Sequence, residues 1–119
     1  MSTQDTCLYH NPLCSKSRAA KAILEERGIP FEVVHYLEDP LTEDDLRSVM
    51  TKLQITDPRQ MMRTNESVYG EIGCDELQGD DLVRAMVANR ILIERPILVR
   101  GNRAVIGRPP EAVEELLES

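Results

Sequence analysis

The sequence has few aromatic residues and few basic ones. It contains no tryptophan, one phenylalanine and three tyrosines, and its 14 Lys and Arg stand against 21 Asp and Glu, for a formal net charge of −7. Non-specific nucleic-acid binding needs a basic face, and single strands also need aromatic side chains on which bases stack. Anionic membranes attract the same kind of basic surface. The composition therefore argues against nucleic-acid and membrane partners.

Cysteine is also scarce, and long hydrophobic runs are absent. Three cysteines are too few, and odd in number, for the disulfide framework of a small secreted protein. The first residues, Met1–Asp5, lack the basic start and apolar stretch of a signal peptide. No run approaches the ~18 apolar residues of a membrane span. We therefore expect a cytoplasmic protein in which a useful cysteine is a free thiol.

The remaining composition is that of an ordinary globular domain. The chain has 119 residues, of which 41% are hydrophobic and 29% charged, and domains usually run to about 100–200 residues. No internal repeat, low-complexity tract or linker divides it. We expect a single domain over residues 1–119, and nothing in the patterning demands more than a monomer.

The first third of the chain alternates between strand and helix patterns. Residues 7–10 are short and apolar and predict a strand. Ala20, Ile23 and Leu24 then have the i, i+3, i+4 spacing of one helix face. Residues 31–36 predict a second strand. The connection between the two strands is long enough for a parallel pair.

The middle of the chain is predicted to be helical. Thr42 and Asp45 have the spacing of a capping box at a helix start. Asp57 followed by Pro58 is typical of the first residues of a short helix. A further helix is expected from Asp80. We therefore expect a helical insertion at about residues 42–92.

The last part of the chain returns to strands. Residues 97–99 and 104–106 predict two strands joined by a two-residue turn. A final helix places Val113, Leu116 and Leu117 on one face. The order is β-α-β, a helical insertion, then β-β-α. Without the insertion, this is the order of a thioredoxin-like α/β domain with a mixed central sheet.

Cys14 lies between the first predicted strand and the first predicted helix. Just before a helical turn, free backbone N–H groups and the positive end of the dipole favour thiolate over thiol. Such positions can lower a cysteine pKa to about 3.5–7.5. Lys16, Arg18 and His10 are expected to add positive charge, and Ser17 to offer the sulfur a hydrogen bond. Cys14 is therefore the candidate nucleophile.

Other cysteine chemistries fit less well. Dithiol exchange needs Cys-x-x-Cys, and the second position here is Ser17. Cysteine phosphatases need a phosphate-cradling loop that ends in an arginine at a longer spacing than Cys14 to Arg18. Cys7, inside a strand pattern, and Cys74, in an irregular stretch, are best explained as buried residues. No cysteine or histidine has the paired spacing of a metal site.

Three arginines lie in unusual settings. Arg63 follows a methionine pair, Arg95 lies between an apolar run and a proline, and Arg108 lies between glycine and two prolines. Each alone can be explained as a solvated or salt-bridged side chain. Together they could form an oxyanion pocket, because a guanidinium is always charged and grips two oxygens at once.

Short motifs containing these residues follow one another along nearly the whole chain. They are His10-Asn11-Pro12-x-Cys14-x-x-Ser17-Arg18, Tyr36-Leu37-Glu38-x-Pro40, Arg63-x-Asn65-Glu66, Arg95-Pro96-Ile97 and Gly107-Arg108-Pro109. With these motifs in this order, the sequence resembles the glutaredoxin-coupled arsenate reductase family, which is called ArsC-like.

The resemblance implies a thioredoxin-like fold with a helical insertion between the second and third strands. It also implies a set of site residues. These are Cys14 as the catalytic cysteine, His10 and Ser17 as residues that help hold the thiolate, Arg63, Arg95 and Arg108 as oxyanion-binding arginines, and Pro96 as a cis-proline beside the cysteine.

The reaction that the resemblance implies is the reduction of arsenate to arsenite. The Cys14 thiolate attacks arsenate, glutathione attacks the adduct, and glutaredoxin clears the resulting mixed disulfide. Glutathione is a co-substrate, and no metal or bound organic cofactor is needed. Ser15 follows the cysteine where characterised members carry glycine, and the chain ends at Ser119, whereas those members extend further. These departures leave open a paralogue with another substrate.

Two other functions fit the same fold. A glutathione-linked oxidoreductase acting on mixed disulfides would need Cys14 but tolerate the loss of Arg63. A non-enzymatic regulator would bind RNA polymerase, as related thioredoxin-like proteins do, often with a redox-sensing Cys-x-x-Cys. Ser17 removes that second cysteine here, so the reductase is the expected function.

Overall fold

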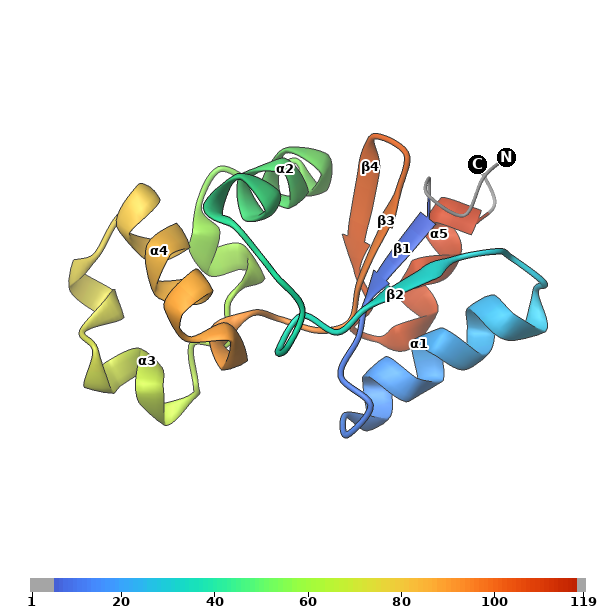
Figure 1. Ribbon diagram of the computed structural model, residues 1–119, viewed down its shortest axis with the longest axis horizontal. Helices are drawn as coiled ribbons and strands as arrows, with labels where there is room; N and C mark the ends of the chain where they lie inside the picture. Colours follow the sequence, from blue (N-terminus) through green and yellow to red (C-terminus); the bar gives the residue numbers. More distant parts are fainter. Residues whose placement is uncertain (1–5, 118–119) are drawn as a thin grey trace. The chain divides into compact units, whose positions relative to one another are not determined.

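The computed structural model of the chain describes residues 6–117 (Figure 1). The polar segment Met1–Asp5, which does not have the pattern of a signal peptide, lies outside the described residues. The chain forms two compact units, one reaching Asp39 and resuming at Arg95, the other spanning Pro40–Glu94. The second unit covers nearly the range expected for the helical insertion. In the described part of the chain, no helix is long and apolar enough to cross a membrane.

The first unit contains a four-stranded mixed sheet in the order β2-β1-β3-β4. Strands β1 (Thr6–Tyr9) and β2 (Glu32–Val34) are parallel and are joined by helix α1 (Ser15–Glu26). Strands β3 (Ile97–Arg100) and β4 (Arg103–Ile106) form an antiparallel hairpin, and β3 also pairs antiparallel with β1. These pairings confirm the predicted thioredoxin-like fold with a mixed central sheet and an insertion before the third strand.

The first two strands are shorter than their sequence patterns predict. His10 lies just beyond β1, although its backbone N–H still donates to the Val34 carbonyl (2.9 Å). His35 lies just beyond β2, where its N–H donates to the Asp39 carboxylate (2.9 Å). Both histidines therefore leave the sheet at the end where the loop before α1 begins.

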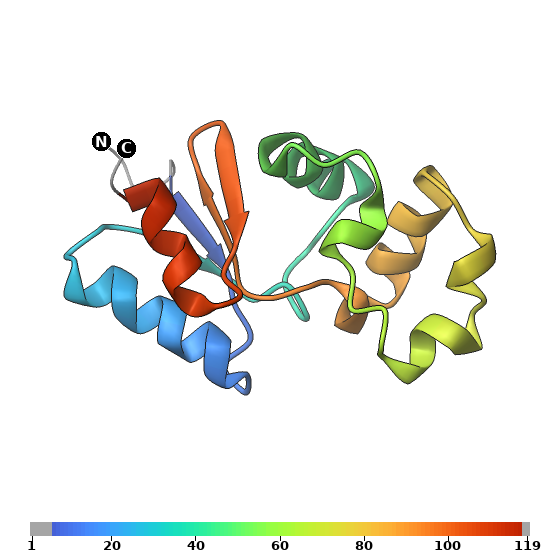
Figure 2. The same ribbon diagram turned by 180° about the vertical axis from the view of Figure 1, so that it is seen from behind.

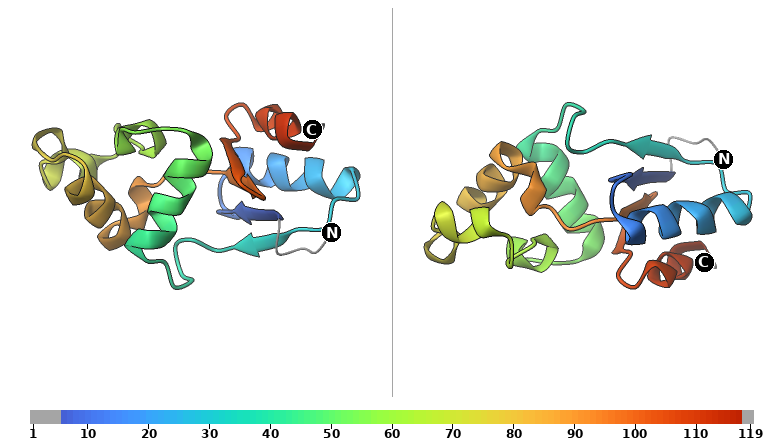
Figure 3. Two further views of the ribbon diagram at one scale, coloured as in Figure 1. Left: turned by 90° about the horizontal axis from the view of Figure 1, so that it is seen from above. Right: turned by 90° about the horizontal axis from the view of Figure 1, so that it is seen from below.

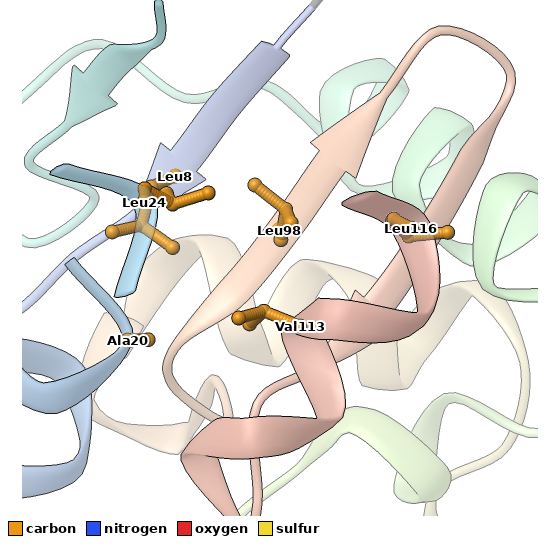
Figure 4. Packing of buried hydrophobic residues seen from close by; sticks show 6 residues of the cluster. All are labelled: Leu8, Ala20, Leu24, Leu98, Val113 and Leu116. Atoms are coloured by element: carbon orange, nitrogen blue, oxygen red, sulfur yellow. The ribbon is translucent and has the colours of Figure 1, made fainter. Parts of the chain in front are cut away.

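One apolar core joins the sheet of this unit to its helices. The 3₁₀ helix η5 (Pro110–Val113) and helix α5 (Glu114–Leu117) follow β4, and Figures 2 and 3 show α1 and α5 on the same side of the sheet. Figure 4 shows six side chains from strands and helices gathered between these layers. They are Leu8, Ala20, Leu24, Leu98, Val113 and Leu116, all almost completely buried. This core fixes the start of α1 relative to the ends of β1 and β3.

The second unit is helical. Thr42 caps its first helix as predicted, since Thr42 Oγ1 accepts from the Asp45 N–H (3.1 Å) and the Thr42 N–H donates to the Asp45 carboxylate (2.9 Å). Asp57 also caps as predicted, with Oδ1 accepting from the Arg59 N–H (3.0 Å), although the helix that follows is 3₁₀. The elements are α2 (Glu43–Leu53), η2 (Pro58–Met61), α3 (Ser67–Glu71), η3 (Cys74–Glu76), α4 (Asp80–Ala88) and η4 (Arg90–Leu92).

Residues 65–79 show little periodicity, yet they are ordered around one arginine. The guanidinium of Arg59 donates to the Tyr69 hydroxyl (2.9 Å) and to the backbone carbonyls of Cys74 (2.8 Å) and Leu77 (2.6 Å). These bonds satisfy polar groups of two short helices that have few hydrogen bonds of their own. Arg59, in η2, thereby ties this segment to η2 at several points.

Candidate active site

Cys14 is the N-cap residue of α1. Its backbone is extended, the helix begins at Ser15, and the Cys14 carbonyl accepts from the Arg18 N–H (3.0 Å). The predicted position just before the first helical turn is confirmed. Free N–H groups of this turn point toward the residue that caps it, which is where a thiolate is stabilised.

The loop that carries Cys14 is folded around Asn11. The Asn11 side-chain oxygen accepts from the Leu13 N–H (3.0 Å), and the Asn11 carbonyl accepts from the Cys14 N–H (3.0 Å). At the other side, Nη1 of Arg18 donates to the Pro12 carbonyl (2.9 Å). An Asn side chain that bonds a backbone N–H two residues on is an Asx turn. The nucleophile is thus held by a closed turn rather than by an open loop.

His10 and Ser17 contact each other beneath this loop. His10 Nδ1 lies 2.6 Å from Ser17 Oγ, both residues are buried, and the same hydroxyl accepts from the Asn11 N–H (3.0 Å). The Ser17 hydroxyl therefore ties the loop to the imidazole, whereas the sequence suggested a hydrogen bond from this hydroxyl to the sulfur. Ser17 instead donates a hydrogen bond to the Cys14 sulfur from its backbone N–H.

The expected positive charge on His10 is wrong. Burial lowers the pKa of His10, and the neighbouring charges of Lys21, His35 and Arg18 lower it further. A histidine with a lowered pKa is neutral at physiological pH. His10 therefore contributes a hydrogen bond to the site and not a charge.

The pKa of Cys14 lies below its ordinary value. Partial burial raises it, but the backbone N–H groups of Ser17 and Lys16 and the guanidinium of Arg95 lower it by more. The two backbone N–H groups act through hydrogen bonding to the sulfur, and Arg95 acts through its charge and through a side-chain hydrogen bond. Of the cations near this thiol, Arg95 supplies the effect that the sequence assigned to Lys16 and Arg18.

Arg95 has unused hydrogen-bonding capacity. Within residues 6–117, its Nε and Nη1 atoms are buried and have no hydrogen-bond partner. Buried polar groups are normally paired, and leaving a charged one unpaired costs free energy. Because this guanidinium also interacts with the Cys14 sulfur, an anion bound next to the sulfur could accept from these N–H groups.

Arg108 lies next to Arg95 in the same unit. Nη1 of Arg108 donates to the Arg95 backbone carbonyl (3.0 Å). The Arg95–Pro96 peptide bond is cis, as the resemblance implies for Pro96, and so is the bond that follows Arg108. The Pro96 carbonyl accepts from the Gly107 N–H (2.8 Å). The structure thus brings Cys14, Arg95, Pro96 and Arg108 into one part of the first unit.

Arg63, the third arginine, belongs to the second unit. Its guanidinium forms an ion pair with Glu66, and its backbone N–H donates to the Leu92 carbonyl (2.7 Å). The ion pair means that this side chain is already balanced by a carboxylate, in contrast to Arg95. A role for Arg63 in oxyanion binding remains a prediction.

The other two cysteines have different surroundings. Cys74 is fully buried, and burial raises the pKa of its thiol, as expected for a core residue. Cys7, in β1, is partly buried. None of the three cysteines, all of which are described, forms a disulfide. Among residues 6–117, no three His, Cys, Asp or Glu side chains gather in a way that could hold a metal ion.

A hollow of about 280 Å³ opens beside the Cys14 loop. One wall is the loop itself and the other is the segment after β2. The lining residues are His10, Asn11, Pro12, Leu13, His35, Leu37 and Glu38. The sequence offers no direct signal for this hollow, although Asn-Pro after a strand could have pointed to the Asx turn that forms its rim.

A known protein family matches this chain over almost its whole length. The sequence model described as the ArsC family matches residues 9–116. The chain belongs to the ArsC family.

Several ArsC-family relatives cover almost the entire chain. An arsenate reductase of Neisseria meningitidis is 45% identical over 112 residues, which are 92% of this chain and 96% of that protein. YfgD of Escherichia coli K12, described as an uncharacterized protein, is 43% identical over 117 residues, 97% of this chain and 98% of that one. The solved structure of an arsenate reductase from Vibrio cholerae is 42% identical with a TM-score of 0.89, over 92% of this chain and 95% of that chain.

Proposed function

We propose that this ArsC-family chain reduces arsenate to arsenite, with Cys14 as the nucleophile. The observation that carries the proposal is the pairing of a thiol of lowered pKa with a guanidinium whose Nε and Nη1 are buried and have no hydrogen-bond partner among the described residues. The first feature raises the fraction of Cys14 present as the nucleophilic thiolate, and the second supplies donors for a tetrahedral oxyanion. The names of relatives at 45% identity support arsenate as that oxyanion.

The first step forms a sulfur–arsenic bond. The Cys14 thiolate attacks arsenic(V) of the arsenate monoanion, one proton is taken up, and one oxygen leaves as water. The product is a Cys14 thioester of arsenic acid with one negative charge. Arg95 and Arg108, together with Arg63, are proposed to stabilise the charge on the arsenate oxygens as it redistributes. Cys14 and arsenic do not change oxidation state in this step.

The second step transfers two electrons. The thiol of glutathione attacks the Cys14 sulfur, a disulfide bond forms, and the sulfur–arsenic bond breaks with its electron pair on arsenic. Arsenic is thereby reduced from the pentavalent to the trivalent state and leaves as arsenite, while two thiol sulfurs are oxidised. Glutaredoxin then reduces the Cys14–glutathione mixed disulfide by thiol exchange. The proposed cycle uses no metal and no bound organic cofactor.

The test is arsenate-dependent NADPH consumption in the presence of glutathione, glutaredoxin and glutathione reductase. We expect turnover with the wild-type chain, none with Cys14→Ser, and near wild-type turnover with Cys7→Ser as the matched control. Absence of turnover in a folded wild-type chain would overturn the proposal. If that chain instead reduced a glutathione mixed disulfide on a test peptide, the function would be that of a thiol oxidoreductase.

A further inference from the structure

We propose that Glu66 occupies Arg63 in the free protein as an internal substitute for the substrate oxyanion, and that the oxyanion displaces this carboxylate when it binds. Glu66 thereby sets the affinity for the oxyanion. This inference rests on the proposed function, in which Arg63 is one of the oxyanion-binding arginines. It is argued only from contacts within the second unit.

Glu66 uses its carboxylate on Arg63 and not on the helix that it precedes. It is the N-cap residue of α3, yet its side chain makes no cap hydrogen bond. Short polar side chains are preferred at such a position, because they reach the free N–H groups of the first helical turn. The longer side chain of Glu66 instead forms an ion pair with the Arg63 guanidinium. The choice of residue therefore serves the arginine.

A carboxylate resembles one edge of a tetrahedral oxyanion. Both present two oxygens that share negative charge, and a guanidinium binds both in the same two-pronged way. The side chains of Arg63 and Glu66 are 21% and 23% exposed, so the pair is partly withdrawn from solvent. Removing one partner of such a pair leaves an uncompensated charge, which costs free energy. The free protein avoids this cost with Glu66, and the complex avoids it with the oxyanion.

The backbone of Arg63 is held independently of the ion pair. Its N–H donates to the Leu92 carbonyl (2.7 Å), and the preceding Met62 forms a β-bridge with Ile93. The Arg63 carbonyl accepts from the Glu66 N–H (3.1 Å), which keeps the two residues together in one turn. Breaking the ion pair therefore leaves Arg63 in place, and Glu66 stays close enough to pair with it again after the product leaves.

Competition of this kind weakens the binding of the oxyanion. Binding breaks one ion pair to form another, so the net gain at Arg63 is smaller than for a guanidinium that starts without a partner. Even an exposed ion pair contributes up to a factor of about five to an equilibrium, and this pair is partly buried. Removing the charge of Glu66 should therefore tighten oxyanion binding about fivefold or more.

Binding without turnover tests the exchange directly. Arsenate is titrated into the chain carrying Cys14→Ser, which lacks the nucleophile, and the Nε–H signal of Arg63 is followed by NMR. We expect arsenate to shift this signal, and Glu66→Gln, added to Cys14→Ser, to lower the dissociation constant of arsenate about fivefold. Glu71→Gln is the matched control, because Glu71 is an exposed carboxylate of α3, and it should not change the constant.

Steady-state kinetics separate the exchange from a structural role. Glu66→Gln should lower KM for arsenate about fivefold, and the effect should appear in KM rather than in kcat, because the carboxylate competes with the substrate. Glu66→Asp keeps the charge and should reverse most of the fall in KM. In an Arg63→Ala background, Glu66→Gln should no longer lower KM, because the guanidinium for which the two anions compete is gone.

The outcomes also distinguish this inference from the proposed function. Tighter arsenate binding in Glu66→Gln, by a chain that does not turn over arsenate, would support the exchange and overturn the proposed function. Robust turnover with the same KM in Glu66→Gln and the wild type would overturn the exchange alone. A raised KM would show that Glu66 positions Arg63 for the substrate, and the exchange would be wrong. An Arg63 signal that arsenate does not shift would overturn it as well.

Discussion

The guanidinium of Arg95 interacts with the sulfur of Cys14, and two of its nitrogens, Nε and Nη1, are buried with no hydrogen-bond partner in the described part of the chain. Arg95 therefore serves both the Cys14 thiol and the oxyanion that this thiol would attack. It lowers the pKa of the nucleophile, and it holds N–H groups ready for an anion. Nη1 of Arg108 donates to the Arg95 backbone carbonyl, so a second guanidinium lies beside the backbone that carries Arg95.

Replacing Arg95 should change the nucleophile itself. In Arg95→Ala the cation near the thiolate is lost, so the pKa of Cys14 should rise toward its ordinary value. The pH dependence of iodoacetamide alkylation measures this pKa directly. Arg103→Ala, which removes an exposed arginine at the start of β4, is the control and should leave the profile unchanged. A profile that does not move in Arg95→Ala would separate this arginine from the thiolate.

Arg63 is predicted to behave differently. Its charge is balanced by Glu66 in the second unit, and it is not among the groups that lower the pKa of Cys14. If it binds the oxyanion as proposed, Arg63→Ala should lower kcat/KM for arsenate by about 100-fold, the scale of one lost oxyanion donor, with the alkylation profile unchanged. Arg63→Lys, which keeps the charge, should recover part of the loss. Unchanged kinetics would remove Arg63 from the site.

Stability should depend on pH through Cys14. A cysteine in an unfolded chain has a pKa of about 8.5, and the folded value is lower. Between the two values the unfolded state binds more protons, so folding stability rises with pH. The contribution is complete above about 8.5 and is lost as pH falls through the folded pKa. The unfolding free energy of the wild type minus that of Cys14→Ser should therefore increase with pH, which urea unfolding measures. A difference independent of pH would contradict a stabilised thiolate.

His10 should lower the stability further at acid pH. Its folded pKa is lowered by burial, whereas an unfolded histidine has a pKa of about 6.5. As pH falls below that value the unfolded state takes up a proton that the folded state resists, so stability falls. NMR titration of the imidazole gives the folded pKa, and His10→Gln should remove this part of the acid sensitivity. An ordinary titration of His10 would show that its bond to Ser17 does not require the neutral ring.

Much of this arrangement follows from local sequence patterns. Thr42 with Asp45, and Asp57 with Pro58, bring the capping groups and the backbone they satisfy close together in sequence, so the helix starts are predictable. The position of Cys14 before α1 follows from the apolar periodicity that begins with Ala20. These features need no knowledge of how distant segments meet.

The chemistry of the site depends on contacts that sequence spacing does not encode. The link between His10 and Ser17, 2.6 Å apart, depends on where β1 ends, one residue earlier than the apolar run suggests. Arg95 precedes β3, which is far from Cys14 in sequence and reaches it because β3 pairs with β1. Lys16 and Arg18 are the nearer cations in sequence, yet Arg95 is the one that lowers the Cys14 pKa.

Gly107 is predicted to be essential for the geometry beside Arg95. A Cβ atom at this position would lie 2.8 Å from Pro96 Cγ and 3.1 Å from Val113 Cγ1. The proline ring cannot swing aside as a flexible side chain does, because it is part of the backbone that carries Arg95. Gly107→Ala should therefore destabilise the fold by about 1–3 kcal/mol, the usual cost of overpacking. It should also lower the alkylation rate of Cys14, because Arg95 moves with Pro96.

Gly70→Ala is the matched control for this substitution. Gly70 lies in α3, and an added Cβ there meets no atom within 4 Å. Alanine is favoured over glycine in a helix by about 1 kcal/mol, so this variant should be as stable as the wild type or more so. Urea unfolding of both variants, followed by alkylation kinetics at one pH, completes the comparison. If Gly107→Ala matched Gly70→Ala in both measurements, the close contact with Pro96 would have no part in positioning Arg95.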